Sequence, residues 1–114
     1  MTEHIINKEE RRDYFDHLSK SAQGQEVELE IVGLDIGDQI EREWSLFEGI
    51  SYDPKEDIMY LYGTSLEHSI HSPTEVMVAE DNSSLKSILV KDSKGHFQII
   101  KFRKASQERP NSPN

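Results

Sequence analysis

The sequence has no cysteine and no long apolar run, and each absence excludes a class of structure. Without cysteine there is no disulfide, no thiolate nucleophile and no zinc site built on sulfur, which agrees with a reducing compartment. No stretch approaches the roughly 18 apolar residues of a membrane-spanning helix, and the first residues do not resemble a signal sequence. We therefore expect a cytoplasmic protein without a membrane segment.

Basic residues are scarce as well. The chain has 13 lysines and arginines against 22 aspartates and glutamates, a formal net charge of -9. This charge opposes nonspecific attraction to nucleic-acid phosphates and to anionic membranes, so both kinds of partner are disfavoured, although a local basic patch can survive. The sequence also lacks a nucleophile elbow, a glycine-rich phosphate loop and a dinucleotide fingerprint. It indicates no cofactor and favours no enzyme class.

The chain length of 114 residues suits one domain with one hydrophobic core. We expect this domain to span residues 1–103. The remaining segment, 104–114, contains two prolines and no large apolar residue, so it is predicted to be a disordered tail.

One helix is predicted, from about residue 8 to residue 20. Asn7 and Glu10 have the spacing of a capping box, Phe15 and Leu18 recur at helical spacing, and Gly24 offers a left-handed stop.

From residue 25 the hydrophobic period changes to two, which is typical of strands. The connections between the expected strands are too short for parallel crossovers, so the strands must be antiparallel. We expect a mainly β protein with one N-terminal helix (α+β), folded as a small SH3-like or Sm-like barrel; a two-sheet sandwich is the alternative. The predicted strands are about 26–31, 39–47, 58–62, 66–70, 74–78, 85–90 and 97–102.

An acidic face is predicted on the first two strands. Its members are Glu26, Glu28, Glu30, Glu41 and Glu43. If the two strands pair across the turn at 33–38, these carboxylates share the outer face, while Ile40, Trp44 and Leu46 face inward. We interpret the acidic face as a binding surface for the basic surface of a partner protein. The alternative is a solvated surface that discourages aggregation.

His68 and His71 are the most suggestive pair of metal-ligating side chains. The segment reads as a strand, where residues three apart point to opposite sides, so the pair is unsuited to one ion and no metal site is expected. His68 is expected to point inward beside Ile70 and His71 outward. Clustered acids in the turns near residues 35–38 and 53–57 lack the spacing of a calcium loop.

Aromatic side chains recur on the predicted strands: Trp44, Tyr52, Tyr60, Tyr62, Phe97 and Phe102. In so small a domain we expect them in the core, where Trp44→Ala would cost about 3 to 5 kcal/mol. The alternative is that they line a groove for a small molecule.

Short matches over most of residues 8–103 resemble a bacterial family that has no assigned function. They are Tyr14-Phe15, Leu18-Ser19, Gly24, Val27-x-Leu29-x-Ile31-x-Gly33, Gly37-x-Gln39, Leu46-x-x-Gly49-Ile50-x-x-Asp53 and His68-x-Ile70-x-x-Pro73. The chain departs from the family pattern near Asp13, where a tryptophan is usual, and at Gln25, where an aromatic is usual. The resemblance implies a recurring stable domain and transfers no catalytic residue.

Three functions follow for testing. The first is a noncatalytic protein-interaction or regulatory module that uses the acidic face or an open sheet edge. The second is a small-molecule or metal-responsive domain around His68, His71 and the strand aromatics. The third is an enzyme with an unrecognised carboxylate or histidine site. The sequence predicts no oligomeric state.

Overall fold

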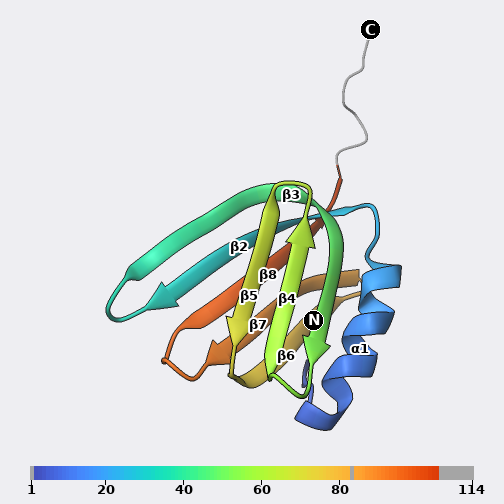
Figure 1. Ribbon diagram of the computed structural model, residues 1–114. Helices are drawn as coiled ribbons and strands as arrows, with labels where there is room; N and C mark the ends of the chain where they lie inside the picture. Colours follow the sequence, from blue (N-terminus) through green and yellow to red (C-terminus); the bar gives the residue numbers. More distant parts are fainter. Residues whose placement is uncertain (1, 83, 106–114) are drawn as a thin grey trace, which may run out of the picture.

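A computed structural model of the protein describes residues 2–82 and 84–105, with the backbone alone described at 41 and 42. The chain forms one helix and, in the described part, eight strands (Figure 1). The mainly antiparallel α+β class predicted from the sequence is confirmed. The elements are β1 (Thr2–Ile5), α1 (Lys8–Ser21), β2 (Gln25–Gly33), β3 (Gly37–Asp53), β4 (Ile58–Gly63), β5 (Leu66–His71), β6 (Pro73–Asp81), β7 (Ser84–Asp92) and β8 (Phe97–Lys104).

The strands form one antiparallel sheet in the order β1-β6-β7-β8-β2-β3-β4-β5. The long strand β3 pairs with β2 along its first half and with β4 along its second half. The sheet turns over along β3, so that β4 and β5 lie in front of β7 and β8 (Figure 1). In the described residues the edge strands β1 and β5 do not pair, so the sheet is open and a closed barrel is not confirmed.

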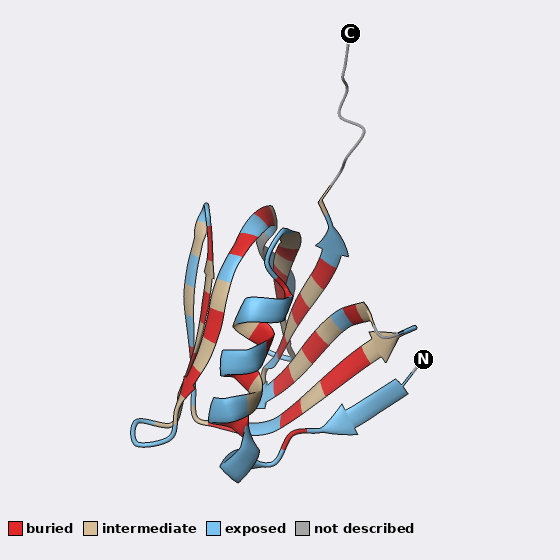
Figure 2. Ribbon diagram, turned by 90° about the vertical axis from the view of Figure 1, so that its right-hand side faces the viewer, coloured by how far each residue is buried: buried red, intermediate tan, exposed pale blue. Residues whose placement is uncertain are grey.

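Helix α1 closes one side of the folded sheet. Glu10 Oε1 accepts a hydrogen bond from the Asn7 N–H (3.2 Å), as expected for a capping box. Phe15 and Leu18 are buried against the strands, and Figure 2 shows the buried residues of the sheet gathered behind the helix. Ser19 Oγ accepts a hydrogen bond from the Ile50 N–H (2.8 Å), which ties the helix to β3. Within 2–82 and 84–105, no helix is long and apolar enough to cross a membrane.

The hydrophobic core lies between the two layers of the sheet and the helix. Strand alternation supplies it, since every second side chain of the central strands points inward. The fully buried residues with the largest side chains are Phe15, Phe47, Leu29, Met59, Leu61, Ile70, Ile88, Ile100, Val27, Val76, Val78 and Val90.

The first half of β3 is turned the other way from the prediction. Ser45 and Phe47 are buried, whereas Ile40 and Leu46 are exposed and Trp44 is only half-buried. The β2–β3 register shifts between Val27 and Leu29 and again between Leu29 and Glu30, which are the positions of β-bulges. The two shifts cancel over this segment, so Ile40 and Leu46 still share one face of the strand. It is the outer face, because they lie opposite outward-facing glutamates of β2.

Trp44 is therefore not a core residue, and the predicted loss of 3 to 5 kcal/mol on its truncation does not apply. Its ring is covered by the guanidinium of Arg103, whose Cζ lies 4.2 Å from the ring centroid. Phe97 is also exposed, Tyr60 and Tyr62 are half-buried and stacked on each other, and only Tyr52 and Phe102 of the predicted aromatic core are buried.

Both ends of the domain differ slightly from the expectation. Strand β1 pairs with β6 and was not predicted, because its four residues have no apolar alternation. Lys104, assigned to the tail, belongs to β8. The disorder predicted for the tail concerns residues 106–114, which lie outside the described residues.

Candidate functional site

The first candidate site is the outer face, which we define as the face of the strands β1, β6, β7, β8, β2 and β3 that points away from the core. Cross-strand register places one residue of each strand in a single row across it. The row consists of Ile5, Met77, Leu89, Ile99, Glu30 and Ile40. We call its five hydrophobic members the apolar row.

The apolar row is open to solvent at its ends. Ile5 and Ile40 are each 47% exposed, and Met77, Leu89 and Ile99 between them are partly exposed. On the central strands β6, β7 and β8 the neighbouring residues point into the core, so the apolar row is no part of it. Five aliphatic side chains in one row are more than the scattered apolar residues of an ordinary surface.

Charged residues flank the apolar row on both sides. One adjacent row runs Glu75, Lys91, Phe97, Val32 and Asp38. The other runs Glu3, Ala79, Ser87, Lys101 and Glu28. The outer face thus has an apolar centre, which Phe97 and Val32 widen on one side, with charged residues around it.

Three of the five predicted acidic-face residues lie on the outer face and are ion-paired. Arg103 Nε lies 2.8 Å from Glu26 Oε1. Lys101 Nζ lies 2.7 Å from Glu30 Oε1 and 3.6 Å from Glu28 Oε1. These partners lie on β8 and could not be predicted from the sequence, because the pairing of β2 with β8 joins distant parts of the chain.

The other two members are not brought into this group by the described contacts. Glu43 is exposed on β3, and the side chain of Glu41 lies outside the described residues. In place of the predicted face of five carboxylates, the described contacts show an ion-paired cluster of three, in which Glu30 is buried.

Asp38 joins the ion-paired cluster from the start of β3. A hydrogen bond with Glu30 raises the pKa of Asp38, because the proton is shared between the two carboxyl groups. The same hydrogen bond, together with Lys101, lowers the pKa of Glu30, and the hydrogen bond with Glu30 raises the pKa of Lys101. The buried member of the pair thus keeps its negative charge.

The second candidate site is a polar network between β5 and the β7–β8 turn. The half-buried His68 donates from Nε2 to Gln98 Oε1 (2.7 Å), and Gln98 donates to Asp92 Oδ2 (2.9 Å). Asp92 Oδ1 also accepts the N–H groups of Lys94 and His96, both at 2.9 Å. Burial acts to raise the pKa of Asp92, but these hydrogen bonds outweigh it and hold the pKa below its ordinary value.

His71 takes no part in this network. It is exposed, and it lines a pocket of about 180 Å³ together with the turn residues Asp92 and His96. Across the described ranges, no group of three or more histidines and acids has the arrangement of a metal site.

His96 belongs to the network and was not identified from the sequence. Its Nε2 donates to Asp35 Oδ1 (2.9 Å), which links the β7–β8 turn to the β2–β3 turn. The ring lies directly over Gly33, since a Cβ there would be 2.4 Å from His96 Cδ2. The spacing of Gly33 and His96 in the chain gives no signal of this contact, which depends on the pairing of β2 with β8.

The fold and these two sites define a small α+β protein with an apolar row on its outer face and a histidine–carboxylate network. Neither site has the residues of a recognised catalytic motif. The chain belongs to the family of unknown function DUF5335, whose model matches residues 2–111. It is 39% identical over 106 residues to an uncharacterized protein of Aquifex aeolicus (strain VF5), which covers 92% of this chain and 96% of that protein. The predicted resemblance to a bacterial family of unknown function is confirmed. No solved structure gives a significant match.

Proposed function

We propose that the protein is a noncatalytic protein-interaction module of the cytoplasm that binds its partner through the outer face. The observation that carries the proposal is the apolar row, which crosses from β1 to β3 and is interrupted only by the ion-paired Glu30. Stable protein interfaces have an apolar centre and a polar rim, and this face has the same organisation.

The charge of the margins favours a partner with basic side chains around an apolar strip. Acids of the outer face outnumber its bases: Glu3, Glu26, Glu28, Glu30, Asp38 and Glu75 against Lys91, Lys101 and Arg103. Complementary charge steers association and selects partners. Lys101 and Arg103 are already paired with the glutamates of β2. The acids at the β1–β6 end of the margins, Glu3 and Glu75, are therefore the ones we expect to meet the partner.

The test compares two variants with the same chemical change. Leu89→Glu places a charge in the middle of the apolar row, whereas Leu34→Glu changes a fully exposed leucine in the β2–β3 turn. Partners captured by the wild type in the producing cell are identified and their affinities measured with purified components. We expect Leu89→Glu to weaken binding by at least about 2 kcal/mol, as for a central interface residue, while Leu34→Glu binds normally.

The contribution of the charged residues is tested separately, by measuring association rates at low and high salt. Replacing Glu3 and Glu75 with glutamine is expected to slow association at low salt and to change dissociation little. Equal binding by the Leu89 and Leu34 variants would contradict the use of this face. Unchanged association of the double glutamine variant would contradict the basic partner.

The pocket beside the polar network supports a second candidate, a small-molecule or metal-responsive domain. Gln98 and Asp92 line a cavity of about 180 Å³, and His68 is hydrogen-bonded to Gln98. A ligand that binds only the folded state raises the melting temperature, and the rise grows with the logarithm of the ligand concentration once this exceeds the dissociation constant. A thermal titration with divalent metals and small metabolites tests this candidate, and a rise that is lost in His71→Ala would favour it over the first.

A further inference from the structure

The paired part of β7 and β8 ends before the strands do. Their register runs from Lys91–Phe97 to Ser87–Lys101 and, in the described residues, stops there. Strand β7 nevertheless begins at Ser84 and β8 continues to Lys104, where it is still paired with Gln25 of β2. The two strands therefore separate at this end of the sheet.

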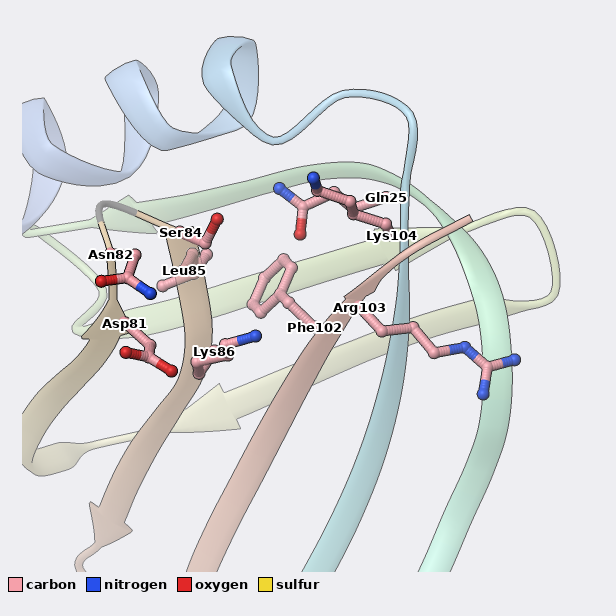
Figure 3. A pocket seen from close by; sticks show the side chains of 9 residues that line it. All are labelled: Gln25, Asp81, Asn82, Ser84, Leu85, Lys86, Phe102, Arg103 and Lys104. Atoms are coloured by element: carbon pink, nitrogen blue, oxygen red, sulfur yellow. The ribbon is translucent and has the colours of Figure 1, made fainter. Parts of the chain in front are cut away.

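A pocket of about 340 Å³ fills the space between the separated strands (Figure 3). Leu85 and Phe102, both nearly buried, form its apolar floor. The main-chain groups of residues 85–86 and 102–103 that would have continued the ladder face this space without a strand partner across it. Main-chain N–H groups in such a position require another acceptor, either water or a ligand.

The rim of the pocket is basic, in contrast to the chain as a whole. Lys86, Arg103 and Lys104 line it together with one acid, Asp81, whereas the full sequence carries a net charge of -9. In Figure 3 the Lys86 amine lies on one side of the Phe102 ring, and the Lys104 amine lies on the other beside the Gln25 amide. The two ammonium groups come from the two separated strands and flank the same space.

Arg103 does not contribute its charge to this space. Figure 3 shows its guanidinium pointing away from the pocket. It pairs there with Glu26 and covers the Trp44 ring. The cations left for a ligand are Lys86 and Lys104, with neutral donors from Gln25, Asn82 and Ser84.

We propose that this pocket binds a small phosphate monoester. The phosphate would lie between Lys86 and Lys104, where charge-assisted hydrogen bonds are the strongest available, and the organic part would lie on Leu85 and Phe102. The volume of about 340 Å³ is at the small end of ligand pockets, which run from roughly 300 Å³ upward. Asp81 at the rim can accept hydrogen bonds from ligand hydroxyls, and it repels longer polyanions such as nucleic acids. The site is separate from the apolar row and independent of the function proposed above.

The experiment titrates the full chain with glycerol 3-phosphate, inorganic phosphate, succinate and glycerol, using calorimetry and backbone NMR. We expect saturable binding of glycerol 3-phosphate, tighter than that of inorganic phosphate, with shift changes confined to the ends of β7 and β8 and the β6–β7 connection. Glycerol and succinate should bind far more weakly. Tighter binding of succinate, or shifts spread over the whole surface, would overturn the proposal.

Charge-matched variants separate this pocket from general electrostatics. The double variant K86Q/K104Q should lose about tenfold or more in affinity, the equivalent of about 1.4 kcal/mol. The control K55Q/K91Q removes the same charge at exposed lysines in the β3–β4 turn and on the outer face, and it should bind like the wild type. Equal losses in the two double variants would overturn the pocket. Melting temperatures of all variants verify that each is folded.

Discussion

Gly33 is the residue whose missing side chain allows two hairpin turns to meet. A Cβ at this position would lie 2.4 Å from His96 Cδ2, closer than any ordinary contact. We expect Gly33→Ala to displace the imidazole, to break its hydrogen bond with Asp35, and to lower the free energy of unfolding by about 1 to 3 kcal/mol, as for an overpacked site. Urea denaturation measures the loss.

The background variant His96→Ala serves as the control for this prediction. Without the imidazole the new methyl group has room, so Gly33→Ala should cost much less in that background, giving a coupling energy in the double-mutant cycle. The same cost in both backgrounds would show that the contact between Gly33 and His96 is not the cause.

Asp92 makes the free energy of unfolding depend on pH. Its pKa is lowered in the folded protein, so the unfolded chain binds the proton more tightly than the native state. The carboxylate's contribution to stability is therefore fully present above the unfolded-state pKa and is lost as the pH falls through the lower folded-state value. Asp92→Asn should cost about 1 to 3 kcal/mol at neutral pH, through hydrogen bonds weakened or lost.

The pH profile distinguishes the lost charge from a general packing defect. Between neutral and acid pH, the gap in unfolding free energy between wild type and Asp92→Asn should narrow. Asp16→Asn, at an exposed position of α1, should follow the wild type throughout. A gap that stays constant down to acid pH would refute the assigned role of the carboxylate.

For single residues, the sequence predicts which side chains face outward but not which residues they contact. The alternation of residues 26–31 correctly places Glu26, Glu28 and Glu30 on the outer face. Their partners Lys101 and Arg103 stand at the far end of the chain, and no local pattern indicates that β8 lies beside β2. His96 was missed for the same reason, because its contacts at Gly33 and Asp35 are equally distant in sequence.

Among the elements, α1 depends on one buried cation for its position. Arg11 is 4% exposed, donates to the carbonyls of Ile6 and Pro73 (3.4 and 3.1 Å), and its Cζ lies 5.4 Å from the Tyr52 ring centroid. It therefore joins the first turn of the helix to β3 and to the start of β6.

Arg11→Lys is expected to destabilise the protein by about 1 to 3 kcal/mol. A lysine keeps the charge but has no planar group to reach both carbonyls and lie on the ring, and a buried acceptor is left unmatched. Arg12→Lys is a matched control, because the neighbouring arginine is exposed and should tolerate the change. Guanidinium denaturation compares the two, and equal midpoints would rule out the anchoring role.

Element boundaries were predicted well where a pattern repeats over several residues, as in α1 and in the β7–β8 hairpin. Strand β1 was missed because its order comes from pairing with β6, and its own four residues show no alternation. The faces of β3 were reversed because Ile40 and Leu46 lie opposite outward-facing glutamates of β2, and the sequence of one strand does not show which residues of its partner lie opposite.

For the whole molecule, the composition and the period of the hydrophobic residues predicted an antiparallel β fold with one helix. Nothing in the sequence specified the order of the strands. Local hairpins account for β6-β7-β8 and for β2-β3-β4-β5, but the join between these two groups is the pairing of β2 with β8. The outer face depends on that join as well, since it brings Ile99 beside Glu30 and completes the row to Ile40. Its apolar row could therefore not be read from the sequence.

The pairing of β2 with β8 also has a consequence for synthesis on the ribosome. Strand β2 leaves the exit tunnel well before β8, so it gains its neighbour on that side only when β8 has emerged. Until then one edge of β2 is unpaired, and Val27 and Leu29, which are buried in the folded protein, lie beside it. Strands exposed in this way associate readily. Such distant pairings also make folding slow. We expect ribosome-bound chains halted before β8 is released to recruit chaperones and to resist protease poorly, and chains halted after its release to acquire full protection.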